Sequence, residues 1–467
     1  MARLLAFTII IITIALGALF LLSHRASGPV IDISQPVRVV GLTATLDFAI
    51  EAPRGDISRI DVAVEQDSRS LPLFSLSDPK EAVLTQETPN RIRVSRSFGQ
   101  QDLPTLQPGV ATLIVSAARP ILFGLSEKIT TIKHQLAVDF DPPRLTTLST
   151  FHYINHGGSE MVIYQVVAQD VVESGVRVGE LTYPGYPAAN AGVTGADETV
   201  KVSFFGLLFD QELSTPIELY AIDEAGNEGR AQFDYRILPQ VFKRTRINLN
   251  DVFLQRVVPK ILERSPVFRE KMPSGENFLS QYVRINGDMR RENAETINSI
   301  TANTAPRKLW QGPFHQLYGS QVESQFAAHR TYFYEGNEVD QQIHLGVDLA
   351  VTANIPITAA NHGKVIYAGY LGIYGNCLLI DHGMNLQSLY AHLSSFTVTN
   401  GDSVEKNEQL GFSGISGLAG GDHLHFTMLL QGQPVSPIEW WDPHWIEDRI
   451  TRKLREATRL VANEDQP

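Results

Sequence analysis

Histidine and aspartate residues with the spacing of metal ligands lie in the last third of this 467-residue chain. In the segment HLGVDLA, Asp348 follows His344 by four residues. Two such residues would share a helix face, but Gly346, Val347 and the β-branched residues that follow favour a strand and its preceding loop. The pair therefore offers one imidazole and one carboxylate from a β-rich region, and both are donor groups that bind zinc.

A second histidine pair lies in the segment GDHLHFTM. Residues i and i+2 of a strand point to the same side, so His423 and His425 face one way while Leu424 and Phe426 face the other. A site on the histidine face and a core on the apolar face would explain this pattern. For this segment alone, a structural pair of histidines explains the pattern equally well.

His392, in LYAHLSS, adds a third segment with an imidazole in a predicted strand. Taken alone it would be read as a structural residue. Catalytic zinc usually takes three protein ligands from His and carboxylates and leaves a position for water. His344, Asp348 and one histidine of the HLH pair supply that set. The two remaining histidines could act on the bound water or on the developing oxyanion, and the residues alone do not say which of the pair is the ligand.

The stretch from Gln321 to Asp442 resembles the lysostaphin/LytM-type (M23) peptidoglycan endopeptidases, and the matching motifs occur in the family's order. HLGVDLA is similar to the H-x-G-x-D motif, and PITAANHGKVIYAG to the hairpin that follows it. YGNCLLIDHG and LYAHLSS are similar to the central strands, and GDSVEKNEQLGFSGISG to the Gly-rich turn region. HLHF is similar to the H-x-H signature.

The resemblance implies one zinc ion held by His344, Asp348 and His425, with catalytic roles for His392 and His423. It implies an endopeptidase that cleaves the peptide cross-links of bacterial cell-wall peptidoglycan, so the peptide stems are the expected partner. In such a site a neutral histidine accepts the proton of the attacking water, and a donating histidine stabilises the oxyanion. Which of the two histidines has which role is left open.

Three departures from the family pattern leave the ligand set intact: Asp422 where Pro is frequent, Thr427 where Glu is frequent, and the stretch Val404–Gln409. A rival interpretation is a catalytically silent relative that binds cell wall and activates amidases. Such relatives typically lack ligands, whereas all five positions are filled here. A third interpretation is an enzyme that acts on another protein or peptide.

Composition sets limits on the class of protein. The chain is 43% hydrophobic and carries a net charge of −12, so it lacks the basic footprint of a general nucleic-acid binder, and no nucleic-acid partner is expected. Its single cysteine, Cys377, excludes an intrachain disulfide and a cysteine-rich zinc site. Cys377 lies in the apolar run NCLLID and is predicted to be a buried core residue.

The first 25 residues predict a membrane anchor. Leu4 to Leu22 contain no charge, and about 20 apolar residues span a bilayer as a helix. The alternative is a cleaved signal peptide, but the SHRASG stretch that follows is a poor match to its cleavage pattern. We therefore expect a single-pass protein of the cell inner membrane with a periplasmic ectodomain. Through its N-terminal helix, the cytoplasmic membrane is an expected partner.

The remaining chain is predicted to be mainly β. Alternating apolar residues indicate a β-sandwich over 30–141 and a second, Ig-like β domain over 142–240. The DEAGNEG turn of the second domain joins two alternating runs and resembles the last hairpin of Ig-like domains in bacterial exported proteins. Residues 247–309 are predicted to be a helical connector, with the stripe from Phe253 to Leu262 interrupted by Pro259 and capped by Asn248 or Asn250. The connector is either a spacer or a regulatory segment over the active-site groove.

Strand patterns return after the connector. The region 310–446 is predicted to be the M23-type peptidase domain, built on an antiparallel β-sheet. Residues 447–467 are predicted to form a C-terminal helix that packs against this domain. The oligomeric state and the particular cross-link cleaved have no signature in the sequence.

Overall fold

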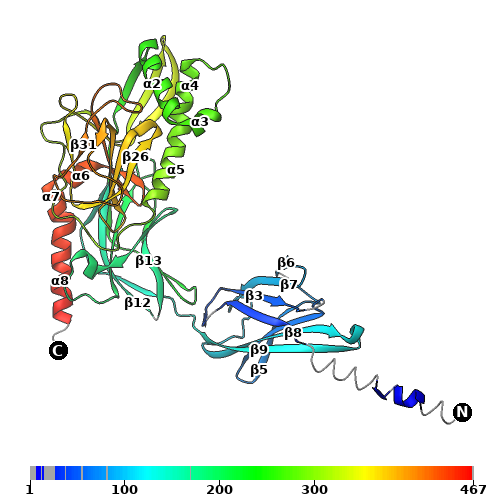
Figure 1. The fold of residues 1–467 in the computed structure, drawn as a ribbon. Helices are drawn as coiled ribbons and strands as arrows, with labels where there is room; N and C mark the ends of the chain where they lie inside the picture. Colours follow the sequence, from blue (N-terminus) through cyan, green and yellow to red (C-terminus); the bar gives the residue numbers. More distant parts are fainter. Residues whose placement is uncertain are drawn as a thin grey trace. The chain divides into compact units, whose positions relative to one another are not determined.

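The structure of the protein is a computed structural model that describes residues 7–11, 13–14, 27–36, 38–53, 56–79, 82–168 and 170–464. It confirms the predicted mainly β class (Figure 1). Contacts between Cα atoms divide the chain into two compact units. The first is Met1–Pro143 with Ala168–Val172 and Ala221–Gly229, and the second is Arg144–Val167, Glu173–Tyr220 and Arg230–Pro467. The exact boundaries of the domains named above stay predictions.

Two sheets of the first unit bury a common hydrophobic core. The alternating residues Leu46, Phe48 and Ile50 are fully buried there, as are Ile60 and Val64. The four-stranded sheet has the order β1 (Val30–Gln35), β3 (Ala44–Glu51), β7 (Arg91–Phe98) and β6 (Val83–Thr88). The five-stranded sheet has the order β2 (Val39–Val40), β9 (Ser126–Val138), β8 (Gly109–Ile121), β4 (Arg59–Gln66) and β5 (Arg69–Ser75).

The described part of the chain contains no helix that is both long enough and apolar enough to cross a membrane. Most of the predicted anchor, Leu4 to Leu22, lies outside the described residues. The anchor therefore stays a prediction.

Three small sheets follow in the sequence, and the Ig-like character of this region also stays a prediction. The first sheet has the order β10 (Arg144–Thr147), β12 (Gly158–Val167), β16 (Val200–Leu207) and β15 (Tyr186–Pro187). The second has the order β14 (Leu181–Pro184), β13 (Val171–Val178), β17 (Ile217–Asp223) and β18 (Glu228–Ala231). The third pairs β11 (His152–Asn155) with β19 (Tyr235–Leu238).

The predicted hairpin around DEAGNEG is shorter than the alternation suggested. Its second strand, β18, ends at Ala231, and the continuation β19 leaves that sheet and pairs in parallel with β11. Between them Phe233 is buried, with its ring 5.0 Å from the ring of His152. The alternation therefore continued into a different sheet, because burial of Phe233 redirects the chain.

Helices follow where the connector was predicted: α2 (Asp251–Arg264), α3 (Pro266–Glu270), α4 (Phe278–Arg284), the π-helical turn η3 (Ile285–Met289) and α5 (Arg290–Thr301). The Asn250 side chain caps α2 by accepting a hydrogen bond from the backbone N–H of Phe253, and α2 continues through Pro259. The predicted apolar stripe is buried apart from the half-buried Phe253, and it shares one core with residues of β22 (Ala328–Tyr334) and of the short turn η4 (Gly372–Tyr374).

An eight-stranded antiparallel sheet carries the chemistry-bearing segments. Its order is β21 (Gln321–Ser324), β24 (Val347–Ala350), β32 (Leu424–Leu430), β28 (Leu386–Leu393), β27 (Gly375–Asp381), β26 (Gly363–Leu371) and β30 (Ser403–Val404), and β33 (Gln433–Val435) pairs with β32. Helix α5 packs beside β26 (Figure 1). Two further sheets have three strands each. One has the order β20 (Arg244–Leu249), β22 (Ala328–Tyr334) and β23 (Asn337–His344), and the other has the order β25 (Pro356–Thr358), β31 (Gln409–Phe412) and β29 (Ser395–Phe396). Cys377 is fully buried in β27, as predicted.

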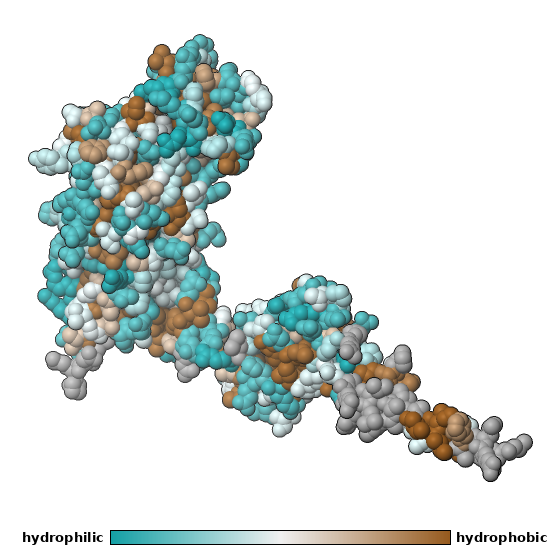
Figure 2. All heavy atoms as spheres, viewed as in Figure 1, coloured by the Kyte–Doolittle hydropathy of each residue, from teal (hydrophilic) through white to brown (hydrophobic). Residues whose placement is uncertain are grey.

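The chain ends in α6 (Pro437–Trp441), α7 (Pro443–Ile446), the π-helical turn η5 (Glu447–Thr451) and α8 (Arg452–Glu464). The C-terminal helix was expected to pack against the peptidase domain. Instead α8 lies along β12 (Figure 1), and the buried Lys453 ammonium bonds Glu160 Oε1 and the Met161 carbonyl, both at 2.8 Å. A buried acid on β12 thus selects the packing partner. On the visible surface of the second unit, hydrophilic residues dominate and apolar residues form small groups (Figure 2).

Candidate metal centre

Neighbouring strands bring the predicted ligands together. His344 is the last residue of β23, Asp348 lies in β24, and His425 lies in β32. The antiparallel register of β24 with β32 places Asp348 directly opposite His425. The next strand in the sheet, β28, carries His392 and pairs Ala391 with His425. Local strand pairing, and not a helical repeat, therefore sets the spacing of these side chains.

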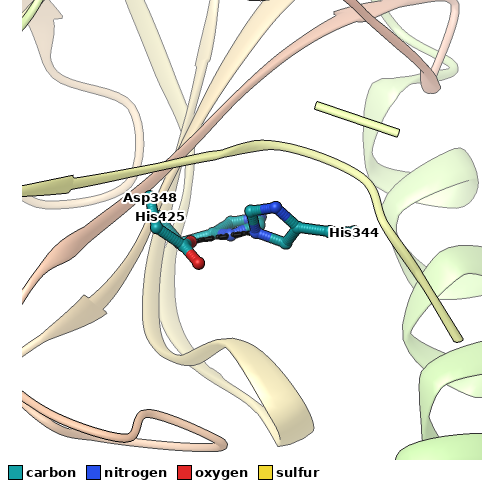
Figure 3. Close-up of side chains that lie close together, drawn as sticks. All are labelled: His344, Asp348 and His425. Atoms are coloured by element: carbon teal, nitrogen blue, oxygen red, sulfur yellow. Dashed lines mark hydrogen bonds and ion pairs between the residues drawn. The ribbon is translucent and has the colours of Figure 1, made fainter. Parts of the chain in front are cut away.

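The three proposed ligand atoms converge on one point (Figure 3). His344 Nε2 lies 2.9 Å from Asp348 Oδ1 and 3.0 Å from His425 Nδ1, and the last two atoms are 2.9 Å apart. Ligands about 2.0–2.1 Å from a tetrahedral zinc ion lie about 3.3 Å from one another, so a small outward shift would admit the ion. Two imidazoles and a carboxylate in this arrangement fit a zinc-type cation.

Hydrogen bonds fix the tautomers of His344 and His425. His344 Nδ1 lies 3.0 Å from the Gln325 carbonyl, an obligatory acceptor, so this nitrogen carries the proton and Nε2 keeps its lone pair. The Thr427 hydroxyl donates to the Leu345 carbonyl at 2.8 Å. Its oxygen can therefore accept the proton of His425 Nε2 at 3.1 Å, which leaves Nδ1 free to bind a metal.

The charge state of the three groups also suits a cation. Burial lowers the pKa of His344, and it lowers the pKa of His425 to about 4, so both rings are neutral. Burial alone would raise the pKa of Asp348, but His344 and the other two nearby histidines hold it well below its usual range. Neutral imidazoles and an ionised carboxylate are the forms that bind metals.

The two predicted catalytic histidines lie beside the ligands. The His392 ring centroid is 4.8 Å from that of His423 and 5.8 Å from that of His425. His392 has a positive φ of 64°, an unfavourable conformation for a residue with a Cβ. Its Nδ1 donates to the Ser416 carbonyl at 2.8 Å, so its Nε2 has a free lone pair. Burial, and then the neighbouring histidines, lower the pKa of His392 well below its usual value.

His423 differs from His392 because both of its ring nitrogens face oxygen atoms. Nδ1 lies 2.9 Å from the Gly421 carbonyl, and Nε2 lies 3.5 Å from Asp348 Oδ1. Burial lowers the pKa of His423, but the hydrogen bond and charge of Asp348 more than reverse this, so the pKa is raised. The surroundings therefore favour a ring that donates from both nitrogens.

A cavity of about 510 Å³ opens onto these five side chains. One wall comes from β20 and the helices that follow it, and its residues include Ile247, Asn250, Phe253, Tyr282, Asn286 and Arg290. The predicted connector therefore lines the cavity and shares a hydrophobic core with the strands behind it. All five predicted site residues come together here.

Three further residues at the centre have no motif of their own in the sequence. The Arg330 guanidinium donates to Asp348 Oδ2 at 2.7 Å and to Ser324 Oγ at 2.8 Å, and Ser324 Oγ lies 3.1 Å from His344 Nδ1. Thr427 was noted only as a departure from the family pattern. A signal for Arg330 existed: it shares a strand face with the buried residues Ala328 and Tyr332.

The sequence model of Peptidase family M23 matches residues 342–437, so the chain contains a peptidase M23 domain. The DD-carboxypeptidase/endopeptidase Mpg of Neisseria meningitidis is 38% identical over 97 residues, which cover 21% of this chain and 22% of that protein. The peptidoglycan DD-endopeptidase ShyA of Vibrio cholerae is 31% identical over 96 residues, which cover 21% of this chain and 22% of that protein. The match thus spans about a fifth of the length of these relatives.

A solved structure, the catalytic domain of lysostaphin from Staphylococcus simulans, is 22% identical and has a TM-score of 0.21. The alignment covers 32% of this chain and 96% of that domain. A likeness of this extent has no bearing on activity.

Proposed function

We propose that the protein is a zinc metalloendopeptidase that hydrolyses the peptide cross-links of bacterial peptidoglycan. The observation that carries this proposal is the convergence of His344 Nε2, Asp348 Oδ1 and His425 Nδ1, each with a free lone pair, beside two further histidines. Two nitrogen donors and one oxygen donor are the set used by catalytic zinc sites that keep a position open. The names of the Neisseria and Vibrio relatives support a peptidoglycan substrate.

The surrounding residues suggest how each histidine acts. When bound, zinc supplies Lewis acidity to water and to the scissile carbonyl. His392 Nε2 has no proton, because the proton of the ring is committed to the Ser416 carbonyl. It can therefore accept the proton of the attacking water and later pass it to the leaving amine. His423, with oxygen acceptors at both nitrogens, is the donor that stabilises the oxyanion.

The rival proposal, a silent regulator of amidases, is less well supported because no ligand position is lost. The test compares the wild-type protein with His425→Ala and Asp348→Ala. The control is His444→Ala, which removes an exposed imidazole of α7 away from the cavity. We expect one zinc per chain and release of fragments from purified peptidoglycan for the wild type and the control, and loss of both for the other two variants.

A folded wild-type protein that binds no zinc would refute the proposal of a zinc metalloendopeptidase. Zinc binding without fragment release, combined with stimulation of an amidase, would favour the regulator. Mass spectrometry of fragments from peptidoglycans of different peptide composition identifies the bond cleaved. Cleavage of a protein substrate and not of peptidoglycan would support the third interpretation.

For the location, we propose an inner-membrane protein anchored by residues 1–25, with the remaining chain in the periplasm. The uncharged stretch from Leu4 to Leu22 supports this proposal. Sequencing of the mature N-terminus tests it. A start beyond Arg25 would mean that the segment is a cleaved signal peptide.

A further inference from the structure

We propose that Arg330 is a positioning residue that holds Asp348 as a one-oxygen ligand of the metal. The proposal rests on the metal site of the proposed function. The two oxygens of Asp348 have separate partners. Oδ1 faces His344 Nε2 and His425 Nδ1, both at 2.9 Å, whereas Oδ2 accepts a hydrogen bond from Arg330 at 2.7 Å. The second oxygen is therefore turned away from the metal position and occupied.

The bond from Arg330 to Asp348 joins opposite charges in a poorly hydrated place. Only 20% of the Arg330 side chain and 11% of the Asp348 side chain are exposed. Charge-assisted bonds of this kind are shorter and roughly twice as strong as neutral ones. Water cannot readily take the place of the guanidinium, so the carboxylate keeps one orientation.

The same guanidinium also reaches the neighbouring ligand. Arg330 Nη2 donates to Ser324 Oγ at 2.8 Å, and Ser324 Oγ lies 3.1 Å from His344 Nδ1. Ser324 belongs to β21, where it pairs with Asp348 across the sheet. Arg330 thus contacts Asp348 directly and reaches His344 through Ser324.

The fold explains why this role falls to β22. Ala328 pairs with His344 in the β22–β23 ladder, so Arg330 lies two residues along on the same face. β22 ends at Tyr334, before the match to the M23 family model begins at residue 342. Both hydrogen bonds of Arg330 leave the same nitrogen, Nη2, so lysine could supply the charge at this position but not the rigid guanidinium plane that aims the two bonds.

The cobalt(II) form of the full-length protein, purified in detergent, tests the proposal. Cobalt replaces zinc in such sites, and its visible absorption is strong for four ligands and weaker for five. In Arg330→Met the freed Oδ2 can join the metal, so we expect a weaker visible band. Loss of a partner that orients a ligand typically weakens metal binding about 10–100-fold. Competition with a chelator measures this change for zinc and cobalt.

Arg246→Met is the matched control. Arg246 lines the same cavity from the neighbouring strand β20, but its guanidinium bonds Asn248 and lies over the Phe333 ring. It should leave both metal affinity and spectrum unchanged. Arg330→Lys keeps the charge, and we expect it to retain part of the affinity, which a merely structural role for Arg330 would not predict.

Each outcome decides between the proposals. A folded Arg330→Met protein with wild-type metal affinity and spectrum overturns the role of Arg330 and leaves the proposed function standing. So does a variant whose only defect is weaker peptide binding, because Arg330 would then contact the substrate. If Arg330→Met does not fold, a folded Arg330→Lys protein with wild-type affinity and spectrum overturns the role, and weaker affinity supports it. A wild-type protein that binds neither metal removes the proposed function, and this inference with it.

Discussion

Replacement of Thr427 by valine removes the acceptor that fixes the tautomer of His425 while keeping the shape of the side chain. Thr427 is buried, and its oxygen lies 3.1 Å from His425 Nε2. Without metal, the variant ring can move its proton to Nδ1 and donate to Asp348 Oδ1 at 2.9 Å, so no buried donor is left unpaired. Metal binding needs the Nδ1 lone pair and forces the proton back to Nε2, where valine offers no acceptor.

The cost of the substitution therefore falls on metal binding. A buried donor left without a partner costs about 1–3 kcal/mol, which corresponds to about 5–150-fold in the zinc dissociation constant. The Leu345 carbonyl also loses its donor, but it does so with and without metal, and this loss cancels in the affinity. With zinc in excess, the stabilisation that zinc confers on the folded state should shrink by the same 1–3 kcal/mol or so.

Chelator competition gives the affinity, and thermal unfolding with and without zinc gives the linked stability. Thr427→Ser retains the hydroxyl and should behave like the wild type. Zinc affinity in Thr427→Val equal to that of the wild type would sink the argument. So would a variant whose stability falls equally with and without zinc, since Thr427 would then support the fold and not the tautomer.

Two further predictions concern buried charges. Lys453→Met leaves the buried Glu160 without its 2.8 Å partner, which should cost about 3–5 kcal/mol in the free energy of unfolding. Urea unfolding followed by tryptophan fluorescence measures this, and the double variant with Glu160→Gln should recover most of the loss. Burial raises the pKa of Glu439 to about 8, so the folded state binds its proton more tightly than the unfolded state, whose ordinary value is 4.5. The resulting stability is fully present below pH 4.5 and is lost as the pH rises through 8, which predicts a fall of about 3 kcal/mol between pH 6 and 9 that Glu439→Gln should abolish.

Alternating patterns along the chain predicted most of what strand pairing controls. The apolar faces around Phe48 and Val62 are buried, and the i, i+2 relation put His423 and His425 on the same side. Alternation does not say which strands pair, and so it missed the move of β19 to β11 and the packing of α8 on β12. Those choices depend on burial of Phe233 and on the buried acid on β12, which are contacts between distant parts of the sequence.

The site residues were predicted from their side chains, but the groups that prepare them were not. His392 and His423 are each oriented by a backbone carbonyl, that of Ser416 and that of Gly421. Every residue has a carbonyl, so no residue type marks these two positions. No residue type marks the positive φ of His392 either, since that conformation follows from the path of the chain.

Both carbonyls belong to one loop, residues 414–423, and the connector holds that loop. Arg256 of α2 donates to the Ala419 carbonyl at 3.2 Å and to the Gly420 carbonyl at 2.8 Å. The stripe of α2 is buried in a core with Tyr332 and Ile373, so the helix cannot leave without exposing that core. We infer that the connector is a fixed support of His392 and His423. On this reasoning, removal of residues 247–309 lowers peptidase activity, whereas a lid would raise it and a spacer would leave it unchanged.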